Sequence, residues 1–332
     1  MKANRAIKAK GVFINRNRYM LLILLAGFML CLCPPFLNTY QVKFLSFLLI
    51  NILIACSWNL IGGFCNYFSF GHGVFFGIGA YAFAIAWVRF GIYFYLSLIL
   101  GGIMSAGVAL LMSPILRLKG LNFALATLAL LEAVRIIFQK WGFTRGLKGF
   151  DAGWKFPMTL SDQHFFYLIV LVFILMQISL VGFMASRYGF ASAAFKEDEL
   201  MARGIGINTT VCKILAFILS AFWAGVTGAI YAPMITYIST QSIFGINWSI
   251  KPIVVSIFGG IGSLLGPIIG GIILNAIDHF LWERFLEYHT LIYGILLIAI
   301  VLFLPKGFMD YKDRLTRLFQ KKKPYRPIVD LD

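Results

Sequence analysis

The sequence predicts an all-α protein that crosses a membrane many times, and three observations support this. Sixty per cent of its 332 residues are hydrophobic, whereas soluble domains average roughly 45–50% apolar residues. The mean hydropathy is +0.86, an excess that no soluble core could bury. A spanning helix needs roughly 20 apolar residues, and the chain holds about ten such segments by the hydropathy window. No room is left for a soluble catalytic domain.

The apolar segments give the expected elements in chain order. A membrane domain of residues 19–305 lies between a basic N-terminus, residues 1–18, and a basic C-terminal tail, residues 306–332. Spans are expected at 19–37, 44–61, 74–89, 93–112, 121–138, 165–185, 211–232, 248–258, 264–281 and 291–304. Some are too short to cross alone, notably 248–258, and apolar runs of ~10–14 residues are often re-entrant or broken helices.

The net charge of +16 comes largely from the flanks of the membrane domain. Basic flanks stay in the cytoplasm under the positive-inside rule and face anionic lipid there. Both termini are therefore expected in the cytoplasm, and the charge calls for no nucleic-acid partner. The basic start followed by an apolar run also resembles a signal peptide, but no small-residue cleavage pattern follows it. A retained first helix is expected.

Two loops stand out between the spans. Residues 139–164 form the largest external loop, and their Gly, Trp, Phe and Asp content predicts an ordered cap although the loop carries four basic residues. Residues 186–210 form a polar cytoplasmic loop. Ser192 is placed to cap a helix of about three turns that ends at Arg203, before Gly204. Such a charged helix is either a docking site for a soluble partner or an ordinary solvated loop.

Two glycine-rich stretches, residues 59–79 and 259–271, interrupt apolar sequence near the two ends of the chain. Paired glycine-interrupted segments indicate a transport site formed by broken helices near the middle of the membrane. Irregular backbone at membrane depth is tolerated only where it is buried in protein or lines a water-filled cavity. The alternative for any single glycine is close packing of helices, because several glycines fit the small-xxx-small pattern.

No catalytic, cofactor-binding or metal-binding set is expected. The four histidines are dispersed, the five cysteines match no metal or disulfide spacing, and no phosphate-binding GxxxxGK[ST] loop occurs. Ionisable residues inside a membrane are rare, so each is a candidate functional group. Glu132 and Arg135, three residues apart, are expected either to form a structural ion pair or to line an external vestibule. Asp278 and His279 are expected at the membrane interface rather than in a proton relay.

Several motifs in fixed order resemble one family. They are WNLIGG at 58–63, SFGHGVFFGIGAY at 69–81, KGLNFA at 119–124, TLA at 127–129, KEDE at 196–199, GIGIN at 204–208, KILAF at 213–217 and GGIGSLLGP at 259–267. The chain resembles the M-type permease subunit of bacterial branched-chain amino acid ABC importers, within a group that includes urea, amide and sugar permeases. The resemblance implies a second homologous permease, two ABC ATPase subunits and a periplasmic binding protein in the bacterial inner membrane.

The resemblance also implies which residues carry the function. The segment 192–206 becomes the coupling helix that docks on the ATPase. The expected coupling residues are Lys196, Glu197, Asp198, Glu199, Arg203, Gly204 and Gly206. The expected translocation pathway is lined by Asn59, Ser69, His72, Thr127, Glu132, Gly259 and Gly260. The chain departs from the family in having Phe190, Ala191 and Ser192 where arginines are usual, and in its external loop around 149–151.

Three alternatives follow from the same residues. The first is the same machine carrying urea or short amides. The second is a secondary transporter driven by an ion gradient, which would need a buried acidic residue at mid-membrane, and none is well placed. The third is a membrane-embedded enzyme, for which the sequence offers no nucleophile or metal constellation. The favoured expectation is a permease subunit without an ATPase site of its own.

Overall fold

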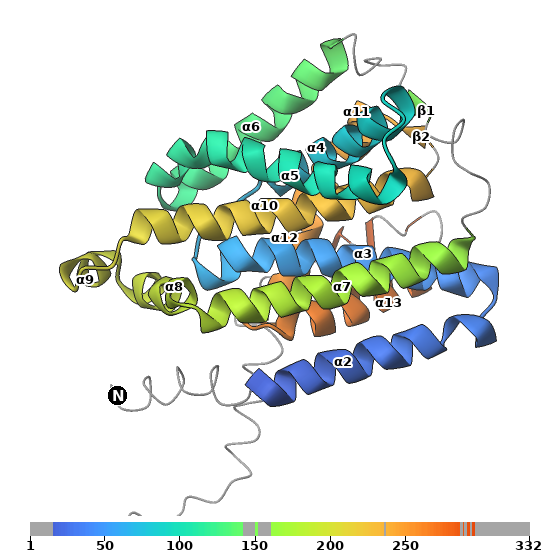
Figure 1. The fold of residues 1–332 in the computed structure, drawn as a ribbon, viewed down its shortest axis with the longest axis horizontal. Helices are drawn as coiled ribbons and strands as arrows, with labels where there is room; N and C mark the ends of the chain where they lie inside the picture. Colours follow the sequence, from blue (N-terminus) through green and yellow to red (C-terminus); the bar gives the residue numbers. More distant parts are fainter. Residues whose placement is uncertain are drawn as a thin grey trace, which may run out of the picture.

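The computed structural model describes residues 16–141, 150–151, 161–235, 237–285, 288, 291–292 and 294–295. These residues form an elongated bundle of long helices that lie side by side (Figure 1). The short helices α8 and α9 stand at one end, called here the loop end, and a two-stranded ribbon stands at the other, called the ribbon end.

The elements follow one another along the chain with few long connections. They are α2 Arg16–Leu32, η1 Pro34–Phe36, α3 Thr39–Asn59, η2 Leu60–Phe64, α4 His72–Ala84, η3 Ile85–Arg89, α5 Phe94–Met112, η4 Ser113–Arg117, α6 Gly120–Lys140, β1 Phe150–Asp151, α7 Asp162–Ala185, α8 Arg187–Glu197, α9 Glu199–Gly204, α10 Thr209–Met234, β2 Tyr237–Ile238, α11 Thr240–Ile243, α12 Asn247–Gly259 and α13 Gly266–Arg284.

Eight helical segments within the described residues are long and apolar enough to cross a membrane. They match the first eight predicted spans to within a few residues at most ends, with the eighth extended to Thr240–Gly259. At 1.5 Å per residue the 21-residue α3 is about 31 Å long, which is the thickness of a bilayer core. The chain is therefore a polytopic helical membrane protein.

The ninth and tenth predicted spans are not among these eight segments. The ninth corresponds to α13, which is less apolar because its last two turns carry Asp278, His279 and Glu283. The tenth, residues 291–304, lies almost wholly outside the described residues, as do most of the basic N-terminus and the whole C-terminal tail. Ten crossings with both ends in the cytoplasm stay a prediction.

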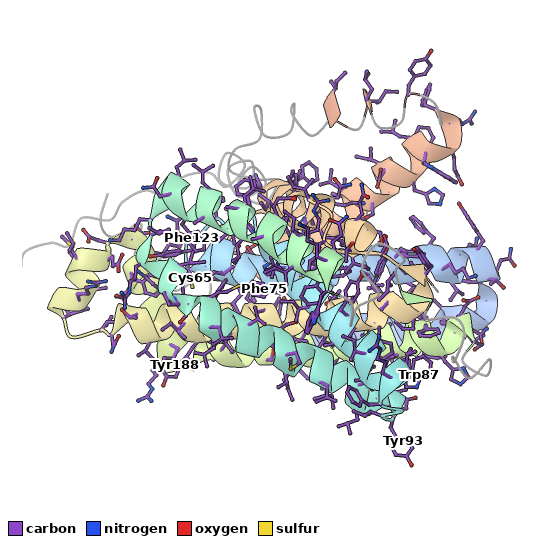
Figure 2. The ribbon with its side chains drawn as sticks, turned by 90° about the horizontal axis from the view of Figure 1, so that it is seen from above. Cys65, Phe75, Trp87, Tyr93, Phe123 and Tyr188 are labelled. Atoms are coloured by element: carbon purple, nitrogen blue, oxygen red, sulfur yellow. The ribbon has the colours of Figure 1, made fainter. Side chains whose placement is uncertain are left out.

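Helix α10 is the centre of the bundle and packs against α3, α4 and α5. Small residues allow these backbones to approach closely. A Cβ on Gly79 of α4 would overlap the backbone of Gly225 on α10, and a Cβ on Gly228 would overlap the carbonyl of Phe76. Phe75 and Phe123 lie among the helices whereas Tyr93, 86% exposed, points away from them (Figure 2).

One feature departs from an all-α fold. Strand β1 pairs antiparallel with β2, with Phe150 opposite Ile238 and Asp151 opposite Tyr237. Strand β1 belongs to the predicted external loop 139–164, of which residues 142–149 and 152–160 lie outside the described part. A two-residue strand has no period that a sequence pattern could reveal. The pairing ties this loop to the chain that leaves α10.

Candidate functional site

The polar loop at the loop end folds into two short helices instead of one. Helix α8 begins after Ser186, whose hydroxyl accepts a hydrogen bond from the amide of Tyr188 at 3.3 Å. The prediction that Ser192 caps the loop helix is wrong. It is buried inside α8, where its hydroxyl donates to the carbonyl of Gly189 at 2.7 Å.

The break between the two helices is at Asp198. Its backbone is extended, with φ −153° and ψ 115°. Its carboxylate accepts hydrogen bonds from the amides of Leu200 at 2.8 Å and Met201 at 3.1 Å. An aspartate that satisfies the first amides of a helix is a strong N-cap, so this side chain ends α8 and starts α9.

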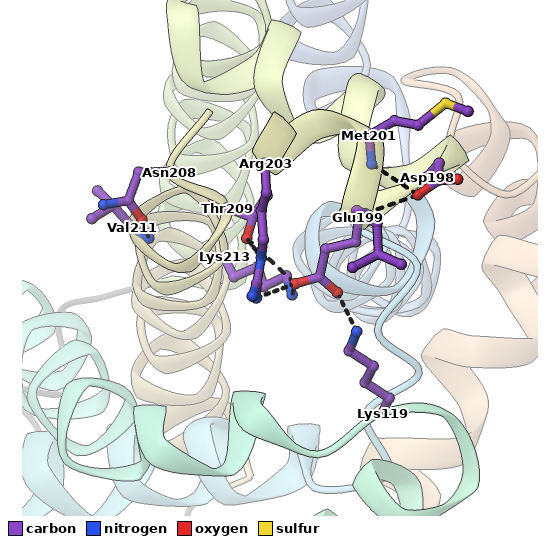
Figure 3. A network of polar contacts seen from close by, with 10 residues as sticks. Lys119, Asp198, Glu199, Met201, Arg203, Asn208, Thr209, Val211 and Lys213 are labelled. Carbon is purple, nitrogen blue, oxygen red and sulfur yellow. Dashed lines mark hydrogen bonds and ion pairs between the residues drawn. The ribbon is translucent and has the colours of Figure 1, made fainter. Parts of the chain in front are cut away.

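Glu199, the first residue of α9, is surrounded by cations (Figure 3). Its carboxylate lies 2.8 Å from the ammonium of Lys119 and 2.7 Å from the guanidinium of Arg203, and it also pairs with Lys213. The Arg203 Nε atom donates in addition to the hydroxyl of Thr209 at 3.1 Å. This cluster, called here the Glu199 cluster, joins α9 to the start of α6 and to α10.

The electrostatics of the Glu199 cluster favour the ionised carboxylate. Partial burial, which leaves 14% of the side chain exposed, opposes ionisation. The hydrogen bonds from Lys119, Lys213 and Arg203 outweigh it and lower the pKa of Glu199 from 4.5 to about 2. The carboxylate is therefore charged throughout the physiological range.

Lys213 is the buried member of the cluster. The residue is only 4% exposed, and its ammonium lies 4.8 Å from the centre of the Tyr67 ring and 5.6 Å from that of Phe195. Aromatic faces attract a cation at these distances. Two faces and the Glu199 carboxylate together compensate for removing the ammonium from water.

The outward surface of the loop carries exposed apolar side chains. Leu200, Met201 and Ile205 are 77%, 73% and 76% exposed. Glu197 is also exposed, whereas Glu199 is turned inward and Asp198 is used as a cap. Gly204 ends α9, and Gly206 follows with φ +84°, a backbone conformation that favours glycine. The roles of these residues toward a partner stay a prediction.

The two glycine-rich stretches meet at the loop end, and Asn59 joins them. Its side-chain oxygen accepts a hydrogen bond from the amide of Gly262 at 2.9 Å, and its side-chain nitrogen donates to the carbonyl of Ser263 at 2.8 Å. Gly63 packs so closely on this pair that a Cβ there would overlap Asn59. This contact is called here the glycine junction.

The glycine junction lies at one end of α3 rather than at its middle, and a transport site formed by broken helices at mid-membrane stays a prediction. Asn59 is the last residue of α3, so about 31 Å of helix separates it from the opposite end at Thr39. The connection 65–71 that follows is non-helical and largely buried within the bundle, which is the setting in which irregular backbone is tolerated.

Three predicted pathway residues hold this connection in place. The Trp58 indole donates to the carbonyl of Ser69 at 2.8 Å. His72 shares a 2.8 Å hydrogen bond with Ser57, and the hydroxyl of Thr127 accepts from the amide of Phe70 at 3.1 Å. All three predicted residues are at most 2% exposed. Contact between these side chains and cargo stays a prediction.

The other predicted pathway residues lie apart from these. Gly259 is packed against the backbone of Gly266, and Gly260 ends α12 with φ +124°. Glu132 and Arg135 form the expected ion pair on α6 at 2.6 Å, with side chains 44% and 30% exposed. A partly exposed ion pair on a spanning helix favours a water-filled path or a protein partner over lipid as its neighbour.

Sequence reasoning did not assign roles to Lys119, Thr209 and Lys213. One signal was available, because Lys213 stands inside an apolar run and a cation there needs a partner. Its partner Glu199 is 14 residues away, too far for any helical spacing rule to connect them. Within the residues that the structure describes, no group of His, Cys, Asp and Glu could hold a metal ion.

A protein-family model described as the permease component of the branched-chain amino acid transport system matches residues 40–301. The chain belongs to this family. Its members are permease components, and a permease component is one part of a larger transport system.

Individual relatives agree with this assignment. The LivM permease protein of the high-affinity branched-chain amino acid transport system is 27% identical in Salmonella typhimurium and 28% identical in Escherichia coli, over 87% of this chain and 74% of the relative. The Escherichia coli LivH permease protein of that system is 35% identical over 37% of this chain and 40% of the relative. No solved structure matches the chain.

Proposed function

We propose that this chain is the permease subunit of an ABC importer that moves leucine, isoleucine and valine into the cytoplasm. The family match over residues 40–301 carries the proposal, because it spans nearly every described helix. The names of the relatives in Salmonella typhimurium and Escherichia coli supply the substrate class.

The energy source is a separate subunit. The sequence has no phosphate-binding loop, so ATP is hydrolysed by partner ATPases. The complete importer comprises this chain, a second homologous permease, two ATPase subunits and a periplasmic binding protein in the bacterial inner membrane. The loop end faces the cytoplasm, in agreement with its basic residues Lys119, Arg187, Arg203 and Lys213. Cargo passes between the two permeases.

The ATPase docks on the exposed face of α9. Leu200, Met201 and Ile205 form an apolar surface on a loop that projects from the bundle (Figure 1). Apolar side chains exposed together outside a membrane mark a site of protein contact. The acidic residues next to them shape and anchor this surface, since Asp198 caps α9 and Glu199 binds the cluster of cations.

Docking is tested by the double substitution Leu200→Ser with Met201→Ser. We expect the ATPase subunits that co-purify with the permease to fall about tenfold or more, because the centre of an interface loses its apolar anchors. Leu118→Ser, at the same end but before α6 and 39% exposed, is the control and should keep them. Equal recovery of ATPase with the double variant and the control would contradict docking through α9.

ATP-dependent uptake tests the acidic run as a whole. Replacing Glu197, Asp198 and Glu199 together with alanine should uncouple transport, because the cap of α9 and the Glu199 cluster are both lost. Glu197→Ala alone should change little if only those two roles matter. ATP-dependent uptake that survives in the triple variant would contradict a coupling role for this loop.

A further inference from the structure

Lys196 is separated by two residues from Glu199 but faces a different part of the molecule. It lies in the last turn of α8, and its ammonium donates a hydrogen bond to the carbonyl oxygen of Gly63 at 2.6 Å. The same Nζ atom lies 2.7 Å from the position that a Cβ on Gly262 would occupy. The Lys196 ammonium therefore sits against both halves of the glycine junction.

Helix electrostatics explain why a cation is placed there. Helix α3 runs without interruption into η2, which ends at Phe64, so the carbonyl of Gly63 is among the last of this helix. The final carbonyls of a helix have no partner within it and form the negative end of its dipole. A lysine that reaches such carbonyls stabilises the helix end.

The glycine junction carries this contact to a second spanning segment. Asn59, at the end of α3, bonds Gly262 and Ser263 in the turn between α12 and α13. A displacement of the Lys196 ammonium therefore acts on the tips of α3 and α12 together. Burial also lowers the pKa of Lys196, which agrees with an ammonium held inside the protein rather than in bulk water.

The polar contacts of the two loop helices reach different spans, although α8 also packs against α7 and α10. Helix α9 is joined to α6 and α10 through the Glu199 cluster, whereas α8 is joined to α3 and α12 through Lys196. The extended backbone of Asp198 lies between them. Lys196 is partly buried, and its ammonium is directed inward to the carbonyl of Gly63 rather than outward to a partner.

We propose that Lys196 is the positioning residue through which the loop moves the tips of α3 and α12, and that it is not part of the surface that binds the ATPase. This inference rests on the proposed function, because it assigns a step in the coupling of ATP hydrolysis to transport. Under this proposal the exposed face of α9 docks the ATPase, and the inward-directed lysine of α8 transmits the movement to the spans.

The test compares Lys196→Met, which keeps the aliphatic stem without the charge, with Lys196→Arg and with Arg187→Met at the other end of α8. Each variant is assembled with the complete importer in vesicles, and uptake per ATP hydrolysed is measured beside co-purification of the ATPases. We expect Lys196→Met to retain the ATPases and to lose about tenfold in uptake per ATP, the size expected for a hydrogen bond to a charged group. Lys196→Arg should restore most of the uptake per ATP, and Arg187→Met should behave as the native chain.

A native thiol gives a readout that does not depend on transport. Cys65 is 1% exposed and follows η2 directly. In a chain whose other four cysteines are replaced by serine, a polar maleimide should label Cys65 at least several-fold faster in Lys196→Met than in the Lys196 chain. Lys196→Arg should protect it.

The two outcomes that overturn the inference are distinct. If uptake per ATP hydrolysed is unchanged in Lys196→Met, Lys196 has no role in transmission. Loss of the ATPases in Lys196→Met, with Cys65 still protected, makes Lys196 a docking residue. If the native complex shows no ATP-driven uptake, the proposed function fails, and Cys65 labelling alone then decides whether Lys196 holds the junction.

Discussion

At the scale of single residues, the partly buried charges of the loop end have partners inside the fold. Glu199 contacts Lys119, Arg203 and Lys213, and Lys196 binds the carbonyl of Gly63. Charged groups taken out of water need such partners, and breaking one contact leaves the other group uncompensated. The sequence located this charged segment, but the direction of its side chains depends on contacts between distant parts of the chain, such as the one between Lys196 and Gly63, 133 residues apart.

The Glu199 cluster predicts a specific pH dependence. A pKa of about 2 in the folded protein against 4.5 for the free group means that ionised Glu199 stabilises the fold above about pH 4.5. That contribution is lost as the pH falls from 4.5 toward 2. We expect the melting temperature of the native chain in detergent to exceed that of Glu199→Gln by a constant amount near neutral pH, and this difference to shrink below pH 4.5.

The control for this prediction is Glu197→Gln, since the neighbouring Glu197 side chain is exposed and forms no ion pair among the described residues. It should leave the melting temperature nearly unchanged. If the difference in melting temperature between the native chain and Glu199→Gln stays constant down to about pH 3, it contradicts a lowered pKa and a stabilising role for the Glu199 carboxylate.

At the scale of elements, glycines set how closely the helices approach. The structure shows close packing at some of these glycines, and the transport site formed by broken helices stays a prediction. Gly79 and Gly259 serve close packing of backbones, whereas Gly260 and Gly262 have positive φ values of 124° and 74° in the turn after α12. A sequence pattern of small residues does not separate these roles, because the partner backbone comes from another part of the chain.

Packing at α4 and α10 can be tested with one methyl group. Gly79→Ala places a Cβ against the backbone of Gly225, which cannot move aside as a flexible side chain would. We expect destabilisation of about 1–3 kcal/mol, measured as a lower melting temperature in detergent. Gly107→Ala on α5, where nothing lies within 4 Å, should be neutral or slightly stabilising. Equal effects of the two substitutions would contradict close packing at Gly79.

The elements themselves were largely predictable, and the reasons differ from element to element. Apolar length placed the spans to within a few residues at most ends, since membrane thickness fixes the length of a crossing helix. The loop helix was misplaced because Ser186, Ser192 and Asp198 are all residue types that cap helices, and the structure uses Ser186 for α8 and Asp198 for α9. The pairing of β1 with β2 was beyond reach, as two residues carry no alternation.

At the scale of the whole molecule, the bundle has a closely packed centre and a two-part loop. Helix α10 packs on α3, α4 and α5, while Lys196 of α8 and Glu199 of α9 make their polar contacts with different helices at the loop end. A force applied to the exposed face of α9 therefore reaches two sets of spans. This arrangement agrees with a permease that is moved by an external ATPase and holds no energy source of its own.

The most direct test of this account is uptake of labelled leucine by vesicles that contain this chain with its second permease, its ATPases and its binding protein. We predict uptake that requires ATP on the side of the loop end, follows loading of the binding protein and is lost in the Leu200→Ser, Met201→Ser variant. Uptake that ignores ATP and follows an imposed ion gradient would contradict the account and identify a secondary transporter.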